Sequence, residues 1–240
     1  MPQSRRVSSG VSGLDTTISG GFPADRAILV RGQIGTGKTT LATQFLVSGI
    51  RNGEPGLLVS VDSKPRHILE DSQRFGWDLQ DAIERKLLAI LDAAPYFTAS
   101  RKNAAVDARQ VTSDLTQQVR TLGATRLVID SLTSLLPPDA TPSVLRDFLR
   151  SLFFSLEDNL GCTVLLTAWD SRDVPKEMGT YAEYLAYGVL ELKLVQIDER
   201  YERRMFVRKM RGTPTDLTER PFTIVPDQGV VLDGVSPRRK

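Results

Sequence analysis

A glycine-rich segment between an apolar run and an amphipathic run constrains this chain more than any other feature. The run Ala27–Val30 predicts a buried strand, and residues 40–50 predict a helix. Between them lies Gly32-Gln33-Ile34-Gly35-Thr36-Gly37-Lys38-Thr39, which fits the phosphate-binding loop pattern at every fixed position. A Gly-rich turn with an incidental lysine is the alternative, but it leaves the order of strand, loop and helix unexplained. The sequence therefore predicts a polyphosphate site at the start of this helix.

The residue types of the loop match the chemistry of a nucleoside triphosphate. Glycines let backbone N–H groups turn inward around the phosphates, and the following helix directs its positive end at the anion. Lys38 is placed to neutralise the outer phosphates, and Thr39 offers a hydroxyl to Mg²⁺. We therefore expect a polyphosphate and Mg²⁺ as ligands. The residues expected to bind them are Gly32, Gly35, Thr36, Gly37, Lys38, Thr39 and Thr40.

Composition excludes several other classes of protein. The 240 residues include 31 Lys and Arg against 29 Asp and Glu, and this net charge of +2 is too even to indicate a nucleic-acid partner. Cys162 is the only cysteine and His67 the only histidine, which excludes an internal disulfide and leaves too few ligands for zinc. No stretch reaches membrane-spanning length, and the first ten residues contain no apolar signal core. We expect a cytoplasmic protein without a membrane partner.

Predicted strands and helices alternate along most of the chain. The predicted strands are 27–30, 57–61, 87–91, 127–130 and 162–168; the predicted helices are 40–50, 65–75, 108–122 and 142–160. Short strands follow at 189–195, 203–210, 221–225 and 229–232, and residues 92–105 predict a surface loop. This order predicts an α/β fold with a mostly parallel central sheet, flanked by helices and extended by antiparallel strands at the C-terminal edge.

One domain is expected to include nearly the whole chain. It spans residues 11–232 and follows a flexible N-terminus of residues 1–10. Residues 233–240 are expected to form a basic tail.

Asp130 follows the apolar run 127–129 and is the second part of the predicted site. In an open parallel sheet, ligands bind beyond the carboxyl ends of the strands. A carboxylate there can hold the water shell of Mg²⁺. The alternative is a strand end that merely faces solvent. Asp62-Ser63 and Thr167-Ala168 end neighbouring predicted strands and are expected at the same edge.

At this point the chain resembles a known family, the KaiC-like ATPases of the RecA superfamily, from about residue 6 to 232. The similar segments are Ser9–Asp15, Gly20-Gly21, Thr36–Leu41, Gln44–Leu46, Gly53–Gly56, Phe75–Leu79, Ile129–Ser131, Lys209–Thr213 and Pro221–Ile224. The resemblance implies a RecA-like P-loop NTPase fold and Mg²⁺-dependent ATP hydrolysis. It also implies a ring-shaped homo-oligomer, by resemblance a hexamer, with nucleotide at the subunit interfaces.

The residues after the second predicted strand depart from the family. Family members carry two adjacent glutamates there, which polarise the attacking water, whereas this chain has Asp62 and Ser63. Asp62 remains the candidate base, but its carboxylate lies one methylene further back. A displacement of about 1 Å can lower a rate about a hundredfold, so we expect slow turnover. A second interpretation is that Asp62-Ser63 caps the helix that begins near Pro65. The sequence is compatible with both.

Lys209 and Arg211 lie in the predicted strand near its end. Alternate residues share a face of a strand, so Met205, Val207, Lys209 and Arg211 are expected on one side, with the apolar pair packed inward. One interpretation is a basic edge that blocks aggregation. The resemblance suggests another, in which the Lys-x-Arg-Gly motif reaches the γ-phosphate of the neighbouring subunit, as an arginine finger does.

Three functions fit these observations. The leading hypothesis is a ring-forming regulatory or signalling ATPase, with a signalling or clock-type protein as partner. Its predicted catalytic residues are Lys38, Asp62, Asp130, Lys209 and Arg211, and its predicted metal-binding residues are Thr39 and Asp130. The alternatives are a DNA-binding ATPase similar to RecA and RadA, and a scaffold that holds nucleotide without hydrolysing it. The chain has no separate DNA-binding domain, which counts against the DNA-binding alternative.

Overall fold

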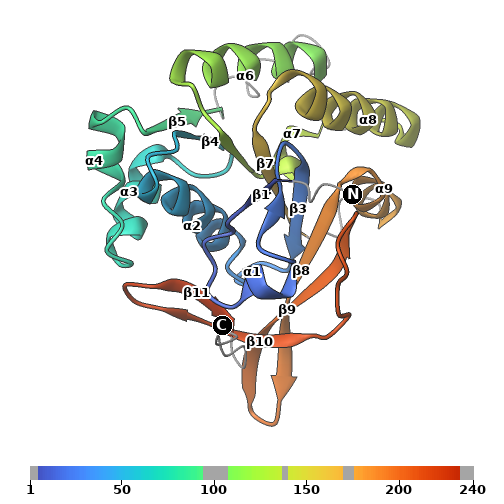
Figure 1. Ribbon diagram of the computed structural model, residues 1–240. Helices are drawn as coiled ribbons and strands as arrows, with labels where there is room; N and C mark the ends of the chain where they lie inside the picture. Colours follow the sequence, from blue (N-terminus) through green and yellow to red (C-terminus); the bar gives the residue numbers. More distant parts are fainter. Residues whose placement is uncertain (1–4, 94–107, 137–139, 170–175, 233–240) are drawn as a thin grey trace.

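A nine-stranded sheet forms the centre of the protein, in the order β11-β10-β9-β8-β3-β7-β6-β4-β5 (Figure 1). The computed structural model describes residues 5–93, 108–136, 140–169 and 176–232. The strands of this sheet are β3 (Ala27–Gly32), β4 (Gly56–Ser60), β5 (Leu88–Asp92), β6 (Arg126–Asp130), β7 (Thr163–Trp169), β8 (Gly188–Ile197), β9 (Arg200–Met210), β10 (Arg220–Val225) and β11 (Gly229–Leu232). Two short strands, β1 (Arg6–Val7) and β2 (Phe22–Pro23), pair separately.

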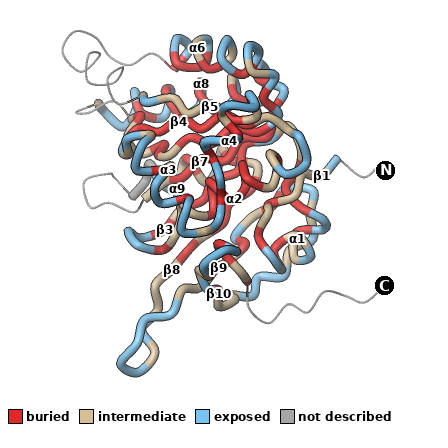
Figure 2. The backbone as a smooth tube through the Cα atoms, turned by 90° about the vertical axis from the view of Figure 1, so that its left-hand side faces the viewer, coloured by how far each residue is buried: buried red, intermediate tan, exposed pale blue. Residues whose placement is uncertain are grey.

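Helices cover both faces of the sheet and create two hydrophobic cores. They are α1 (Leu14–Thr17), α2 (Lys38–Arg51), α3 (Pro65–Gln73), α4 (Leu79–Glu84), α6 (Ala108–Leu122), α7 (Leu132–Leu135), α8 (Pro142–Asn159) and α9 (Lys176–Leu185). The first core joins one sheet face to α6, α7, α8 and α9, and the second joins the other face to α1, α2, α3 and α4. The central strands are buried, whereas the hairpin of β8 and β9 projects from the body (Figure 2).

The predicted α/β fold is confirmed. Strands β8, β3, β7, β6, β4 and β5 run parallel to one another. Parallel neighbours need a crossover connection, and helices packed on the faces of the sheet provide it. Strands β9, β10 and β11 pair antiparallel; short turns join β8 to β9 and β10 to β11, whereas residues 211–219 connect β9 to β10. The sequence did not predict α4 or α9. α4 is short, and its start is fixed by the Asp78 side chain, which accepts a hydrogen bond from the backbone of Asp81.

The N-terminal segment from residue 5 onward is attached to the domain. Arg6 and Val7 pair with β2, and the side chain of Ser9 is fully buried. Residues 1–4 and 233–240 lie outside the described residues, as does nearly all of the loop predicted at 92–105. Among the described residues, no helix is long and apolar enough to cross a membrane.

A β-bulge changes the face on which Lys209 lies. Val207 pairs with Leu190, whereas Lys209 pairs with Val189, so Arg208 is an extra residue in β9. Met205 and Val207 pack into the core with α2, but Lys209 lies on the opposite face, beside α9. The predicted common face for these three residues is therefore wrong, because strict alternation does not hold across a bulge.

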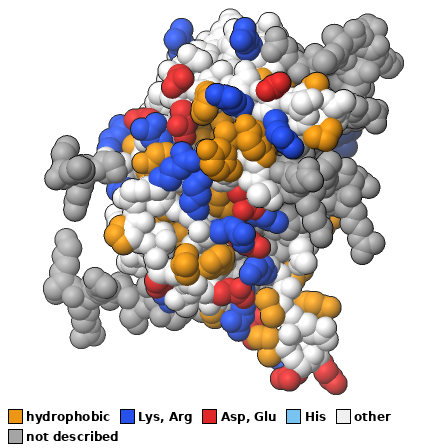
Figure 3. Space-filling view, turned by 90° about the vertical axis from the view of Figure 1, so that its right-hand side faces the viewer, with side chains coloured by type: hydrophobic (Ala, Val, Ile, Leu, Met, Phe, Trp, Pro, Cys, Tyr) orange, Lys and Arg blue, Asp and Glu red, His pale blue; other side chains and the backbone are white. Residues whose placement is uncertain are grey.

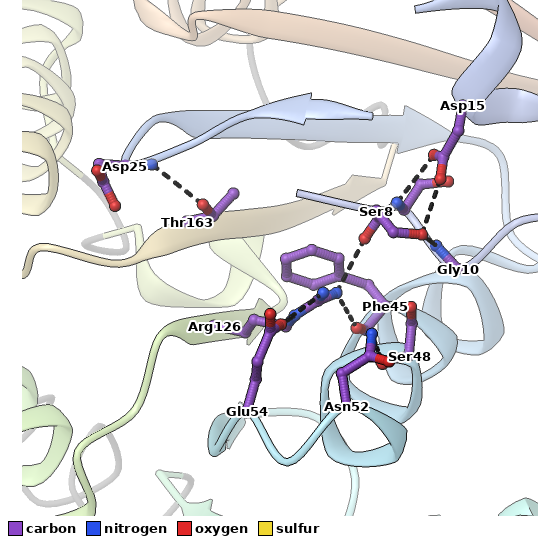
Figure 4. Close-up of polar contacts among 11 residues, drawn as sticks. Ser8, Gly10, Asp15, Asp25, Phe45, Ser48, Asn52, Glu54, Arg126 and Thr163 are labelled. Carbon is purple, nitrogen blue, oxygen red and sulfur yellow. Dashed lines mark hydrogen bonds and ion pairs between the residues drawn. The ribbon is translucent and has the colours of Figure 1, made fainter. Parts of the chain in front are cut away.

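Arg126 fastens helix α2 to the sheet (Figure 4). Its side chain is fully buried, and its guanidinium donates to the Glu54 carboxylate from Nε (2.9 Å) and Nη2 (2.8 Å). Nη1 donates to the carbonyl oxygens of Ser8 (2.9 Å) and Phe45 (2.7 Å), and the guanidinium lies 4.7 Å from the centre of the Phe45 ring. At Gly49 of α2, a Cβ atom would lie only 2.5 Å from Arg126 Nε. One side chain thus joins the N-terminal segment, α2 and β6.

Replacing this arginine should destabilise the whole domain. Arg126→Met should lower the free energy of unfolding by about 2–4 kcal/mol, because buried carbonyl groups lose their partners. Glu54→Gln should lower it by only about 1 kcal/mol, because the amide oxygen of glutamine can still accept from the buried guanidinium at this partly exposed position. Urea unfolding measures both, with the exposed Arg120→Met as the control. Equal losses for Arg126→Met and Arg120→Met would contradict this role.

Candidate nucleotide-binding site

The predicted phosphate-binding loop connects β3 to α2 and borders a cleft of about 560 Å³. The cleft lies at the carboxyl ends of β3, β4, β6 and β7, where open parallel sheets bind ligands. The residues that line it are Ile34, Gly35, Gly37, Lys38, Thr39, Thr40, Asp62, Ser63, Asp130, Ser131, Trp169, Arg203 and Ile224. Most residues predicted to bind nucleotide therefore lie at one opening.

The loop itself is held by internal hydrogen bonds. The side chain of Thr36 is fully buried and donates to the carbonyl oxygen of Gln33 (2.9 Å), so this side chain shapes the loop from inside. Lys38 Nζ donates to the carbonyl oxygens of Gly32 (2.9 Å) and Gln33 (2.8 Å). These hydrogen bonds hold the ammonium group of Lys38 at the N-terminus of α2, where its charge adds to the partial positive charge of the helix end.

Gly37 precedes α2 in a conformation that favours glycine. Its φ is 99°, in the left-handed region. A Cβ atom at this position would lie 2.6 Å from Cδ1 of Ile224, a side chain that β10 places in the cleft. The backbone conformation therefore favours glycine at this position, and any side chain would also have to displace the Ile224 methyl group.

Asp130, at the end of β6, accepts hydrogen bonds from hydroxyl groups on two sides. Thr39 Oγ1 donates to Oδ2 (2.8 Å), and Thr167 Oγ1 makes a short hydrogen bond to Oδ1. A threonine hydroxyl beside a single carboxylate suits Mg²⁺, which keeps several of its waters. The predicted pair of metal-binding residues is thus brought together, and Thr167 orients the carboxylate.

Asp62 faces the same cleft and accepts hydrogen bonds from two serines. Ser131 Oγ donates to Oδ2 (2.9 Å), and Ser134 Oγ lies 2.6 Å from Oδ1 and 2.7 Å from Oδ2. The capping interpretation is wrong, because α3 has Lys64 at its N-cap position and no side chain makes a capping hydrogen bond. The structure places Asp62 with the cleft residues rather than with the helix end.

Lys209 and Arg211 lie near the N-terminal end of β3, whereas the phosphate-binding loop follows the C-terminal end of that strand. Lys209 pairs with Val189, which pairs with Leu29 in the first half of β3. The backbone N–H of Arg211 donates to the carbonyl oxygen of Tyr187 (3.0 Å), which is adjacent to the start of β3. At about 3.3 Å per residue, the Arg211 backbone lies roughly 15 Å along the sheet from the end of β3. Neither cation lines the cleft of its own chain.

Sequence reasoning missed two groups of residues at the cleft. Arg203 of β9 donates from Nε and Nη2 to the carbonyl oxygen of Gly35 (3.3 Å each), and Ile224 contacts the position of Gly37. Both come from distant strands; Ile224 ends the family-like segment Pro221–Ile224, but nothing in that pattern places its side chain at the loop. Ser134 could have been suspected, because it lies one helical turn after Ser131 in the segment that follows Asp130.

Comparisons with known proteins agree with this geometry. A family model described as "ATPase: KaiC" matches residues 7–235. A UPF0273 protein of Pyrococcus horikoshii is 32% identical over 240 residues, covering 95% of this chain and 94% of the relative. The circadian clock oscillator protein KaiC of Picosynechococcus sp. is 33% identical over 225 residues, covering 93% of this chain but 43% of that protein.

A solved structure has the same fold. The crystal structure of a KaiC-like protein from Pyrococcus horikoshii superposes with a TM-score of 0.82 at 31% sequence identity, covering 96% of this chain and 99% of that chain. The resemblance carried by the sequence motifs is confirmed: the chain belongs to the KaiC ATPase family.

Proposed function

We propose that this protein binds Mg·ATP in the cleft and hydrolyses it slowly, as a ring-forming regulatory module. The observation that carries the proposal is the hydrogen bond that the Thr39 hydroxyl, just after the loop, donates to the Asp130 carboxylate at the end of β6 (2.8 Å). Lys38 holds the outer phosphates, and Thr39 with Asp130 holds the metal. When bound, Mg²⁺ neutralises charge on the phosphate oxygens.

The surroundings of Asp62 support slow hydrolysis. A base must reach the attacking water and retain a free lone pair for its proton. The aspartate side chain is shorter than the glutamate usual in the family, and hydroxyl groups of Ser131 and Ser134 already bond both carboxylate oxygens. These hydroxyl groups take up part of the hydrogen-bonding capacity of the carboxylate and fix its orientation, which leaves it less free to accept the proton of the water.

A scaffold that holds nucleotide without hydrolysing it remains the second candidate, and the same hydrogen bonds at Asp62 favour it. The two candidates differ in whether ADP accumulates over hours with saturating Mg·ATP. In either case a signalling or clock-type protein would read the nucleotide state.

The position of the two cations supports a ring with nucleotide between subunits. Lys209 and Arg211 are too far along the sheet to contact phosphates bound to the loop of their own chain. They could instead contact a nucleotide bound by a neighbouring subunit. A head-to-tail ring needs two different complementary surfaces on each subunit. Exposed apolar side chains lie beside the loop and beside the two cations: Ile34 is 78% exposed at the loop, and Tyr184 is 67% exposed near the cations. On the side bearing α8 and α9, Lys and Arg gather around exposed hydrophobic side chains (Figure 3). A hexamer is the number proposed from the family.

Lys38→Ala should greatly weaken Mg·ATP binding, because the phosphates lose their nearest cation. Ligand that binds only the folded state stabilises it by about 2.7 kcal/mol at a hundredfold excess over Kd. The wild type should therefore melt at a higher temperature with Mg·ATP, and Lys38→Ala should show little shift. The exposed Lys86→Ala serves as control and should behave as the wild type. Equal shifts for Lys38→Ala and wild type would exclude the loop as the binding site.

Asp62→Glu should raise the hydrolysis rate by roughly 10- to 100-fold, because the longer side chain restores the reach to the attacking water. Asp62→Asn should lower the rate. The control is Asp158→Glu, an exposed residue of α8 that does not line the cleft, and it should leave the rate unchanged. Initial rates of phosphate release measure all three. An unchanged rate in Asp62→Asn would remove Asp62 as the base.

Arg211→Ala should lower hydrolysis by roughly 10³–10⁵-fold, the contribution of an arginine finger, without unfolding the subunit. Mixing it with Lys38→Ala should restore part of the activity, since some interfaces then pair an intact loop with an intact arginine. Size-exclusion chromatography with differently tagged subunits confirms that mixed rings form. If mixed rings form and remain inactive, the site is completed within one chain.

A further inference from the structure

A two-stranded ribbon continues the sheet beyond the phosphate-binding loop. β8 pairs with β3 only as far as Leu192, which lies opposite Gly32, whereas its pairing with β9 continues to Ile197. β10 joins β9 only over residues 203–205. Residues 193–202 therefore form a hairpin that pairs with no third strand among the described residues (Figure 2). This hairpin, which we call the arm, projects roughly 16 Å past the end of β3 at about 3.3 Å per residue.

One face of the arm continues the wall of the nucleotide cleft. Tyr201, Arg203 and Met205 alternate along β9 and share a face, since the bulge lies further along the strand. Met205 is buried in the core with α2, and Arg203 lines the cleft. Tyr201, the next residue outward on this face, is 69% exposed. A two-stranded ribbon is at best marginally stable alone in water, so a partner surface that covers Tyr201 would stabilise the arm.

The tip of the arm, residues 198–202, is acidic. Asp198 and Glu199 make the turn between β8 and β9, and Glu202 follows in β9. All three carboxylates belong to exposed residues, and Arg200 is the single cation of the tip. The tip therefore combines net negative charge with an exposed aromatic ring, and acidic side chains mark the end of the projection in Figure 3.

The face that bears α9 has the opposite charge. The side chain of Arg26, just before β3, is 44% exposed, whereas that of its partner Glu157 is 22% exposed. Arg208 is 51% exposed, but its partners Glu183 and Glu191 are only 12% and 15% exposed. Because these carboxylates lie inward and the guanidinium groups lie outward, this face presents positive charge to solvent (Figure 3).

The acidic tip lies far from the positive face of its own chain. At about 3.3 Å per residue, the tip is roughly 20 Å along the sheet from Arg208 and roughly 35 Å from Arg26. The two surfaces are complementary in charge, and each offers an exposed tyrosine: Tyr201 on the tip and Tyr184 at the end of α9. Two different, complementary surfaces on one chain are what head-to-tail contact between copies requires.

We propose that the arm packs on the α9 face of a second copy of this chain, with its acidic tip against the exposed guanidinium groups and Tyr201 against Tyr184 of that copy. The inference rests on the head-to-tail ring proposed above and adds a contact that needs no nucleotide. The arm leaves the sheet beside the cleft, so a neighbour that covers the cleft with its α9 end lies within reach of the arm.

Photo-cross-linking identifies what the arm contacts. Tyr201 is replaced by the photoreactive residue p-benzoylphenylalanine, and the protein is irradiated after assembly with Mg·ATP. Covalent dimers should form, and mass spectrometry should place the far end of the link in residues 181–187 or 208–211 of another copy. The matched control carries the same photoreactive residue in place of Arg85, an exposed residue of α4, and should give no covalent dimer.

Reversing the charge of the tip should weaken assembly without unfolding the subunit. Glu199→Lys combined with Glu202→Lys should raise the protein concentration of half-assembly by about tenfold or more, because like charges then face each other. Tyr201→Ser should raise it by about tenfold, the loss expected for a buried aromatic anchor. The matched control, Asp81→Lys combined with Glu84→Lys, makes the same charge change at two exposed residues of α4 and should assemble as the wild type does. Light scattering with Mg·ATP measures the assembled mass, and thermal unfolding without nucleotide reports folding.

The possible failures are distinguishable. If the wild type assembles and the reversed tip assembles at the same concentration, the arm contact is wrong and the ring stands. A link from position 201 only to its own chain, or no covalent dimer in assembled protein, would overturn the arm contact in the same way. A wild type that stays monomeric with Mg·ATP would instead refute the ring itself, and the arm contact with it.

Discussion

The hydrogen bonds of the buried Arg126 guanidinium are the interaction on which the nucleotide site depends most. They fix the middle of α2 to β6 and to the N-terminal segment, so the two elements that carry the phosphate-binding loop and Asp130 cannot shift independently. A buried charge requires full hydrogen bonding, and here Glu54 and two carbonyl groups provide it. The distance between the loop and the Asp130 carboxylate is thereby set from the opposite end of β6.

At the C-terminal end of β6, hydroxyl groups orient the two carboxylates that face the cleft. Thr39 and Thr167 orient Asp130, whereas Ser131 and Ser134 orient Asp62. The two carboxylates therefore differ in chemistry: one is directed at the loop that would bring Mg²⁺, and the other is restrained by serines. This difference fits a protein in which nucleotide binding is retained and hydrolysis is slow.

The C-terminal strands place two cations far from the phosphate-binding loop of their own chain. Because β9 runs antiparallel to β8, its first residues lie near the loop, where Arg203 contacts Gly35, and its last residues lie near the start of β3. The fold therefore offers a cation to its own loop at one end of β9 and presents Arg211 at the other. That arrangement is one basis of the head-to-tail ring proposed above.

The sequence by itself determined the α/β fold, the phosphate-binding loop motif and the placement of Asp130 beside it, because these depend on local patterns: apolar periodicity, glycine spacing and a carboxylate at a strand end. The tertiary structure alone decided the surroundings of Asp62 and the face of Lys209. Asp62 meets Ser134 only because β4 and β6 are neighbours in the sheet. Lys209 turned to α9 because one extra residue in β9 reversed the alternation, and a bulge depends on pairing with another strand rather than on the strand's own pattern.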